Sequence, residues 1–232
     1  MKKGIDISAY QPQVNWDVLK QNVDFTILRI GYGKTASQKD KCFEQHYANC
    51  KRLKIPVGGY WYSYAMTEDE ARQEARACIE CIKDKQLEYP IYYDVEESKQ
   101  FALGGAIVSS MIRAFCDEME KAGYFVGLYT NYSSLCTHIA DDIKTRYAIW
   151  LAHWNVSKSP YQGQYGIWQY AVGTIAGING QVDLDYGYID YPAIIKEKGL
   201  NNFKSENVPH GTIQVEVRID GITYNGTLER RD

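Results

Sequence analysis

Short apolar runs alternate with amphipathic stretches along most of the chain. Eight of the runs have the length and the β-branched or aromatic content of strands. They cover residues 4–8, 25–31, 57–63, 90–96, 124–130, 147–153, 165–170 and 182–185. Helical periodicity appears between the early runs, over residues 14–21, 40–53, 68–85 and 105–122. A strand followed by a helix, repeated, is typical of a parallel α/β sheet.

The later runs are connected differently. Between residues 147 and 186 they follow one another through loops of roughly 10 to 12 residues, with little helical pattern between them. We therefore expect an α/β fold, an irregular TIM-like (β/α) barrel with eight strands and about five helices. In such barrels the functional residues lie at the carboxyl ends of the strands.

The C-terminal part of the sequence has another pattern. Residues 201–211 are polar and predict a linker that follows a barrel domain covering 1–200. In 212–232, apolar and polar positions alternate on both sides of the turn-forming pair Asp220-Gly221, which predicts a β-hairpin appendage. Because a lone hairpin is marginally stable in water, we expect it to pack on the barrel, to form a homodimer with a second copy, or to begin a longer structure.

Composition and charge narrow the classes of function. Of the 232 residues, 45% are hydrophobic and 24% are charged, which allows a large core. The net charge of −3, without a basic cluster on an aromatic strand, argues against a nucleic-acid partner. No run has the length of a membrane span or the pattern of a signal peptide. We therefore expect no membrane insertion and a chain made in the cytoplasm that acts outside only after release.

Cysteine and histidine give no clear metal or redox pattern. The six cysteines fall in helix-like stretches, where small buried thiols are common. Cys78 and Cys81 have the spacing of a metal or redox motif, but no second such pair accompanies them. His153 lies at a predicted strand end without another histidine nearby. We therefore expect no metal site and no cofactor.

Carboxylates at predicted strand ends are the strongest candidates for chemistry. Asp94 and Glu96 end an aromatic run and, two positions apart in a strand, would leave the same face about 6 to 7 Å apart. Asp6 follows the first short strand, and Asp183 lies in the last one. A closed barrel would bring all four acids to one mouth. Repulsion between neighbouring carboxylates tends to keep one of them protonated near neutral pH, as a general acid requires.

Four carboxylates suit two kinds of chemistry, divalent metal binding or acid chemistry on an acetal. Metal sites in hydrolases usually include histidine ligands, whereas glycoside hydrolysis needs only carboxylates and a sugar cleft. The chain also has 20 Tyr and five Trp, many near predicted strand ends. Such rings pack cores, and they also suit stacking against sugar faces. The pattern therefore favours glycoside hydrolysis.

A series of short motifs runs through the predicted barrel in order and with regular spacing. They are Gly4-Ile5-Asp6-Ile7-Ser8 with Gln11 and Trp16, the strand at 25–31, Pro56-Val57-Gly58-Gly59-Tyr60-Trp61, Asp94-Val95-Glu96, Tyr129-Thr130-Asn131, Trp150-Leu151-Ala152, Trp168-Gln169-Tyr170, Gly177-Ile178 and Val182-Asp183. Together these motifs resemble the glycoside hydrolase family 25 muramidases, the Chalaropsis-type lysozymes of fungi, bacteria and many phage endolysins. The resemblance runs from about residue 4 to residue 191 and does not cover the tail.

The resemblance implies a peptidoglycan hydrolase that cleaves the β-1,4 bond between N-acetylmuramic acid and N-acetylglucosamine and so lyses the cell wall. Glu96 matches the family's general acid, and Asp94 matches the carboxylate that assists it. Asp6 and Asp183 match the other two acids of the site. The implied substrate-binding residues are Tyr60, Tyr62, Tyr129, Asn131, Trp150 and Gln169. Asp185 stands where the family often has Asn, which leaves the assignment between Asp183 and Asp185 open.

Two other functions remain as alternatives: a wall-binding module that has lost catalysis, and a metal-dependent peptidoglycan deacetylase. The four acids argue against the first. For a muramidase, both a substrate-assisted retaining route and direct attack by water stay open, because they differ in carboxylate separations that a sequence does not contain.

Overall fold

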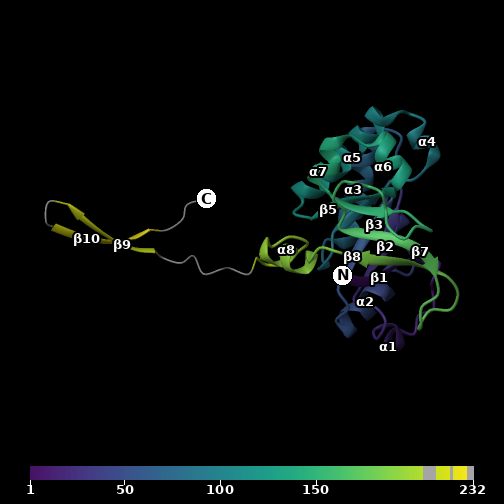
Figure 1. The fold of residues 1–232 in the computed structure, drawn as a ribbon, viewed down its shortest axis with the longest axis horizontal. Coiled ribbons are helices and arrows are strands. Elements are labelled where there is room, and N and C mark those ends of the chain that lie inside the picture. The colour runs from purple at the N-terminus through teal and green to yellow at the C-terminus, as the bar shows by residue number, and fades with distance from the viewer. Residues whose placement is uncertain (206–212, 220–221, 229–232) are drawn as a thin grey trace.

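The computed structural model describes residues 1–205, 213–219 and 222–228. Eight strands form a closed barrel in the order of the sequence, which confirms the predicted architecture (Figure 1). The strands are β1 (Lys2–Ile7), β2 (Phe25–Tyr32), β3 (Val57–Tyr62), β4 (Ile91–Asp94), β5 (Val126–Asn131), β6 (Ala148–Ala152), β7 (Ile167–Gly173) and β8 (Val182–Gly187). Each corresponds to one predicted strand.

The barrel is mixed. Strands β1 to β7 run parallel, whereas β8 is antiparallel to both of its neighbours, β7 and β1. A parallel crossover needs about a dozen residues or more. The connection 153–166 between β6 and β7 is long enough for one without a helix, but the connection 174–181 before β8 is too short. The expected parallel sheet therefore holds only through β7.

Eight α-helices occur in the described part of the chain, where the sequence predicts about five. They are α1 (Trp16–Leu19), α2 (Phe43–Leu53), α3 (Glu68–Ile82), α4 (Ser98–Phe101), α5 (Gly105–Lys121), α6 (Tyr132–His138), α7 (Asp141–Arg146) and α8 (Tyr191–Glu197), with a 3-10 turn η1 (Ala36–Gln38). The unpredicted helices have at most seven residues, too few for a clear periodicity. No described helix is both long and apolar enough to cross a membrane.

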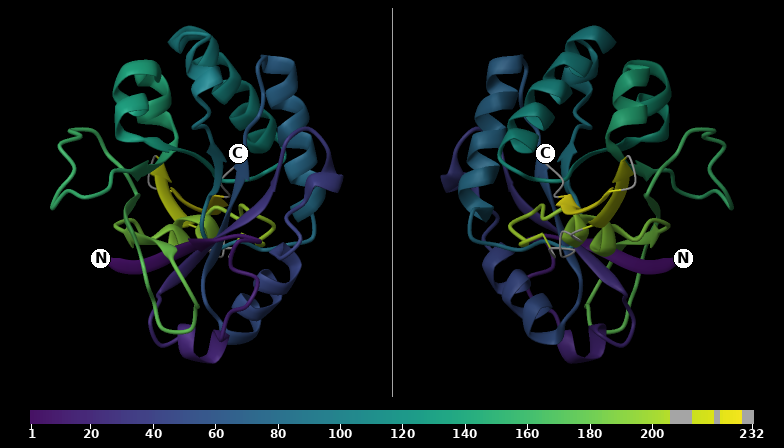
Figure 2. Two further views of the ribbon diagram at one scale, coloured as in Figure 1. Left: turned by 90° about the vertical axis from the view of Figure 1, so that its right-hand side faces the viewer. Right: turned by 90° about the vertical axis from the view of Figure 1, so that its left-hand side faces the viewer.

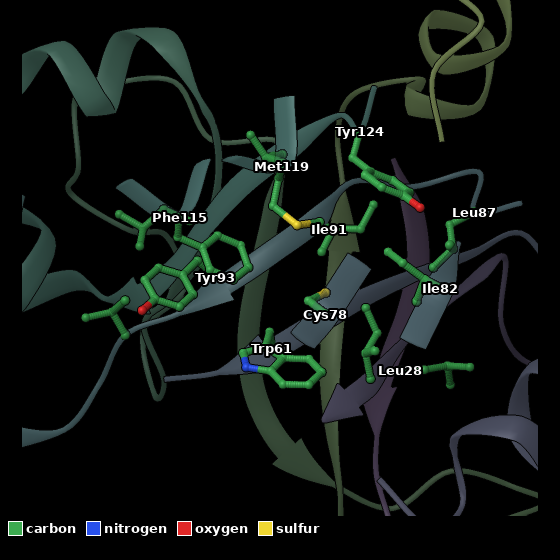
Figure 3. Packing of buried hydrophobic residues seen from close by; sticks show 14 of the residues in the cluster. Leu28, Trp61, Cys78, Ile82, Leu87, Ile91, Tyr93, Phe115, Met119 and Tyr124 are labelled. Atoms are coloured by element: carbon green, nitrogen blue, oxygen red, sulfur yellow. The ribbon is translucent and has the colours of Figure 1, made fainter. Parts of the chain in front are cut away.

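Alternation along the strands divides the hydrophobic residues into two clusters. The longer helices lie outside the barrel (Figure 2), and one cluster lies between them and the strands. In Figure 3, Tyr93 of β4 lies against Phe115 of α5, and the centroids of the two rings are 3.9 Å apart. Cys78 of α3 belongs to the same cluster. The second cluster belongs to the barrel interior and its closed end. It contains Phe25, Ile27, Tyr89, Tyr92, Tyr129, Trp150, Ala152, Ile167, Tyr191 and Ile195.

Glycine at inward strand positions makes room for the rings of this second cluster. A Cβ atom on Gly127 would lie 2.6 Å from the Tyr92 ring, and one on Gly4 would overlap the ring of Phe25. The aromatic cluster therefore fills the barrel interior from Phe25, at the amino end of β2, as far as Tyr129 and Trp150 near the carboxyl ends of β5 and β6. Polar side chains occupy the end of the barrel at the strand carboxyl termini.

Asn201 anchors the end of the barrel domain. Its side chain is fully buried, donates to the carbonyl oxygens of Leu87 and Tyr89 at 2.9 and 3.0 Å, and accepts from the Phe125 amide at 2.8 Å. Its φ of 54° is in the left-handed region, which Asn tolerates better than most residues. The packing of the barrel thus extends into the first residue of the segment 201–211 that the sequence assigns to a linker.

The predicted C-terminal hairpin is present as β9 (Ile213–Ile219) and β10 (Ile222–Leu228). These strands pair with each other in an antiparallel two-stranded sheet. The predicted turn pair Asp220-Gly221 and most of the predicted linker lie outside the described residues. A homodimer through the hairpin stays a prediction.

We expect Asn201→Ala to lower the free energy of unfolding by at least about 2 kcal/mol, because it leaves an amide and two carbonyl groups unpaired in the interior. Urea denaturation monitored by circular dichroism measures the change. Asn201→Gly, which accepts the positive φ, separates backbone strain from the lost hydrogen bonds. The exposed Asn179→Ala is the matched control. A stability of Asn201→Ala equal to that of the control would contradict the anchoring role.

Candidate active site

A pocket of about 180 Å³ lies at the carboxyl ends of the parallel strands. Its walls come from all eight strands and from the loops that follow β1 and β4. Strand β4 ends at Asp94, so Glu96 belongs to the second loop and not to the strand predicted at 90–96. The lining residues are Asp6, Ile7, Ser8, Tyr10, Gln11, Arg29, Tyr60, Tyr62, Asp94, Glu96, Tyr129, Trp150, Gln169 and Asp183. The four acids predicted from the sequence therefore do meet in one place.

A larger cavity, of about 540 Å³, lies elsewhere, beside the amino ends of β6 and β7. Asp141 is the one carboxylate among its lining residues that the structure describes. A single acid there has no second carboxyl partner for acid chemistry on an acetal. The smaller, acid-rich pocket is therefore the candidate active site.

Of the six substrate-binding residues implied by the resemblance, five line the pocket and Asn131 does not. Asn131 ends β5, is exposed, and caps helix α6 by accepting a hydrogen bond from the Ser134 amide at 2.9 Å. An Asn just before a helix is a favoured N-cap. The structure thus gives Asn131 a local role at the helix start.

The antiparallel direction of β8 places Asp183 at the mouth. In the pairing of β1 with β8, Asp183 lies directly opposite Asp6. Because β8 enters the barrel from the mouth, its amino end is level with the carboxyl end of β1. Asp185, two residues further along β8, is buried and does not line the pocket. Asp183 is therefore the acid on the pocket wall.

Asp94 and Glu96 differ in exposure. Asp94 ends β4 and is only 4% exposed, and its Oδ1 atom has no hydrogen-bond partner among the described residues. Burial and then the charge of Glu96 raise the pKa of Asp94 well above its usual value. Glu96 is exposed at the rim. Partial burial of its carboxyl group raises its pKa, with further contributions from Glu97 and Asp183, against a lowering by the Tyr62 hydroxyl.

The sequence predicted that repulsion between neighbouring carboxylates such as Asp94 and Glu96 would keep one of them protonated. The structure places the larger charge effects on Glu96 at Glu97 and Asp183, and the strong upward shift at Asp94 itself. Burial removes water from Asp94 more completely than from Glu96, so desolvation acts more strongly on Asp94. Both carboxyl groups consequently favour the protonated form more than an exposed acid does.

Gln169 of β7 orients Asp6. Its Nε2 atom donates to Asp6 Oδ2 at 2.8 Å, while its Oε1 atom accepts from the Tyr129 hydroxyl at 2.9 Å and from Trp154 Nε1 at 3.1 Å. The two donors to Oε1 fix which way the amide points. Asp6 therefore has one oxygen held by a neutral donor, while burial, Asp185 and Asp183 raise its pKa well above the usual value.

Asp185 forms a second buried contact beneath the pocket. Its Oδ1 atom accepts a hydrogen bond from Trp150 Nε1 at 2.8 Å, and its Oδ2 atom has no partner among the described residues. Burial raises the pKa of Asp185 to about 8, with Asp183 adding to the effect and the Trp150 hydrogen bond opposing it. Burial therefore favours the protonated form of this carboxyl group.

The aromatic residues of the site have two different positions. Trp150 is 1% exposed and forms the floor, with its ring centroid 4.5 Å from that of Tyr129 and 5.9 Å from that of Tyr60. Tyr10 is 81% exposed at the pocket wall, and Trp154, which donates to Gln169, is also exposed. Exposed rings beside polar groups suit contact with sugar faces. Trp150 instead supports the floor.

Sequence reasoning missed Tyr10 and Arg29. Arg29 alternates with Phe25 and Ile27 along β2, and this spacing on an otherwise apolar inward face was the available signal. Its Nε atom donates to Asp40 Oδ2 at 2.7 Å. No local pattern predicts that pair, because the two residues come together only through the turn after β2.

The described residues include no group of three or more His, Cys, Asp or Glu side chains placed to hold a metal ion. The cysteines are free thiols. Burial raises the pKa of Cys78 well above the usual value, so this member of the Cys78 and Cys81 pair is an unreactive thiol. Neither cysteine lines the acid-rich pocket.

Comparison with protein families agrees with this geometry. The model of the family described as Glycosyl hydrolases family 25 matches residues 5–178, a span that contains Asp6, Asp94 and Glu96. The chain belongs to glycosyl hydrolase family 25. The resemblance seen in the sequence motifs is thereby confirmed. Asp183 lies just beyond the matched residues, where the structure brings it opposite Asp6.

Relatives of this family-25 chain include Lysozyme M1 of Streptomyces globisporus, which is 24% identical over 196 residues, 78% of this chain and 66% of the relative. The modular autolysin LytC of Streptococcus pneumoniae is 32% identical with a TM-score of 0.72, over 81% of this chain and 46% of LytC. The catalytic domain of an endolysin from a Listeria monocytogenes bacteriophage is 28% identical with a TM-score of 0.69, over 86% of this chain and 98% of that domain. The chain thus spans less than half of LytC and just under two thirds of Lysozyme M1.

Asp185 makes the stability of this family-25 barrel depend on pH. Its pKa is about 8 in the folded protein and about 3.9 in an unfolded chain. The stability associated with its proton is therefore fully present below about pH 4 and is lost as pH rises toward 8. We expect Asp185→Asn, a neutral isostere, to be more stable than the wild type at pH 8 and to lose this advantage toward pH 4.

Urea denaturation at pH 4, 6 and 8 measures this difference. The exposed Asp69→Asn is the control, and we expect its stability to follow the wild type at each pH. A stability difference between Asp185→Asn and the wild type that is the same at all three pH values would show that Asp185 does not hold the predicted proton.

Proposed function

We propose that this chain is an N-acetylmuramidase that cleaves the β-1,4 bond between N-acetylmuramic acid and N-acetylglucosamine in peptidoglycan by carboxylate acid catalysis. The observation that carries the proposal is the pocket, where a rim glutamate, Glu96, lies beside three further acids, Asp6, Asp94 and Asp183. None of the described lining residues is His or Cys. Burial raises the pKa of the lining tyrosines Tyr60, Tyr62 and Tyr129 further above its usual value. The carboxyls are therefore the groups of the pocket best suited to transfer a proton to an acetal oxygen.

Glu96 is the proton donor in this proposal. It is the exposed acid of the pocket, so a glycosidic oxygen can reach it, and its raised pKa favours the protonated form that donation requires. The neighbouring Asp94 is buried with a free Oδ1 atom aimed at no described partner. Because Asp94 lines the pocket, its carboxyl group can act on the substrate there, either on its acetamido group or on positive charge that develops at the anomeric carbon.

Asp6 and Asp183 complete the acidic wall from the first and last strands. Their negative charge, when ionised, stabilises an oxocarbenium-like transition state. The wall is also sterically defined, because Gln169 holds Asp6 in place. Exposed Tyr10 and half-buried Tyr62 supply ring faces for the glycan beside these acids.

Family membership and named relatives also support the proposal. Lysozyme M1 is named for its activity, and LytC has been solved in complex with a synthetic peptidoglycan ligand. The two alternatives from the sequence predict other products from purified peptidoglycan. A deacetylase would release acetate and would lose activity in EDTA, and a wall-binding module would release neither acetate nor reducing ends.

The two possible routes use the same carboxylates and differ in their first product. A substrate-assisted route retains the anomeric configuration of the new reducing end, and direct attack by water inverts it. Proton NMR of the products at early times distinguishes the two.

We expect purified peptidoglycan treated with the wild type to gain reducing ends, and Glu96→Gln to reduce that rate at least about 100-fold, the usual range for loss of a general acid. Gln has the size of Glu, so we expect the fold to be retained. Its amide cannot act as a general acid, so the rate falls. The measurement is the initial rate of reducing-end formation, with a thermal unfolding curve for each protein.

Glu80→Gln is the matched control, because Glu80 is exposed on α3 and pairs with Lys83 away from the pocket. We expect it to equal the wild type. A folded Glu96→Gln variant that keeps more than about a tenth of the wild-type rate would remove Glu96 from the role of general acid.

A further inference from the structure

The acidic pocket contains one guanidinium group. Among the described residues that line it, Asp6, Asp94, Glu96 and Asp183 are acidic and Arg29 alone is basic. A neutral glycan gives such a cation no ionic partner. The position of Arg29 therefore bears on which chemical group of the substrate reaches this side of the pocket.

Arg29 is held from behind. Its Nε atom donates to Asp40 Oδ2 at 2.7 Å, and the Arg29 and Asp40 side chains are 15% and 0% exposed. Asp40 also accepts from the amides of Ala9 and Cys42, at 3.0 and 2.8 Å. The guanidinium is thus fixed through its Nε edge by a carboxylate that has its own supporting hydrogen bonds.

The rest of the guanidinium is free of polar partners. Neither Nη1 nor Nη2 donates a hydrogen bond to a described residue. The Tyr10 and Tyr32 rings flank the group, with its central carbon 5.1 and 5.8 Å from their centroids. Flanking rings and the Nε contact preorganise the planar fork, so little side-chain freedom remains to be lost on binding. The geometry matches that needed to bind a carboxylate through two parallel hydrogen bonds.

If Arg29 acted only on the acidic residues of the protein, its Nη1 and Nη2 groups would have no hydrogen-bond acceptor. Burial and the charge of Glu96 raise the pKa of Asp94, and Arg29 partly lowers it. The effect of Arg29 on the pKa of Asp94 requires a positive charge, but it does not require two Nη groups that are free to donate hydrogen bonds. The described residues contain no hydrogen bond between Arg29 and Asp94. A carboxylate from outside the protein satisfies both features.

We propose that Arg29 binds a carboxylate on the C3 substituent of the muramic acid unit and so distinguishes peptidoglycan from neutral N-acetylglucosamine polymers. This inference rests on the proposed muramidase function. The carboxylate is that of the lactyl group in glycan without peptides, or one on the stem peptide where the lactyl group is amidated. Arg29 is a binding residue in this account and takes no part in proton transfer.

The test compares three glycans: peptide-free glycan with free lactyl carboxylates, the same glycan after methyl esterification, and uncross-linked glycan that carries stem peptides. We expect Arg29→Gln to raise KM about tenfold or more on a carboxylate-bearing glycan, since charge-assisted hydrogen bonds are lost, with little change in kcat. On esterified glycan, wild type and variant have the same KM. Arg29→Lys, with the charge but no fork, falls between them.

Arg52→Gln is the matched control, because Arg52 is an exposed arginine that pairs with Asp17 and does not line the pocket. We expect it to behave as the wild type on all three glycans. Removing Arg29 leaves Asp40 buried without its partner, so thermal unfolding of each variant is recorded. The wild type gives an independent measurement, because its own KM rises about tenfold on esterification if Arg29 binds the lactyl carboxylate.

The three glycans distinguish the lactyl carboxylate from the carboxylate of the stem peptide. A KM effect of Arg29→Gln on peptide-free glycan that esterification removes assigns the lactyl group, and an effect confined to peptide-bearing glycan assigns the peptide. Equal losses on carboxylate-bearing and esterified glycans, with no esterification effect on the wild type, overturn the inference alone. Failure of the wild type to form reducing ends from any glycan overturns the proposed function and the inference with it.

Discussion

The antiparallel pairing of β8 with β1 is the constraint on which the site depends. It closes the barrel and places Asp183 opposite Asp6, at the mouth that Asp94 reaches from β4. Like charges that share a buried mouth disfavour one another, and burial disfavours each of them. The acids therefore differ in solvent exposure, from buried Asp185 inside the barrel to Glu96 at the rim. Glu96 is the exposed member of the set.

Contacts away from the mouth keep these acids in place. Behind β4, the Tyr93 hydroxyl donates to buried Glu74 at 2.7 Å and accepts from Ser63 at 2.8 Å. This network fixes the strand that carries Asp94 from its outer face, and Trp150 fixes Asp185 from the inner face. The packed rings of the barrel interior and the core under the helices supply the hydrophobic stabilisation that offsets the cost of burying carboxyl groups.

The strands and the four acids were predictable because alternation and strand-end position are local properties of the sequence. The direction of β8 was not predicted, because the alternation of apolar and polar residues is the same in a parallel and an antiparallel strand, and the direction depends on the short connection 174–181. Arg29 was overlooked because its partner Asp40 is reached only through the fold. Asn131 belongs to the motif Tyr129-Thr130-Asn131, which suggests a substrate contact. The structure shows that its side chain caps α6 instead, and the start of that short helix was not predicted. Asn201 begins a polar segment of the sequence, which suggests an exposed linker, but the fold buries its side chain completely.

Burial at and beneath this mouth raises the pKa of its carboxyl groups and so favours their protonated forms. Carbon-13 NMR titration of the side-chain carboxyls, assigned by single Asp→Asn and Glu→Gln variants, tests it most directly. We expect a midpoint near pH 8 for Asp185 and raised midpoints for Asp6, Asp94 and Glu96. Midpoints near the ordinary value of about 4 for all of these groups would contradict this expectation.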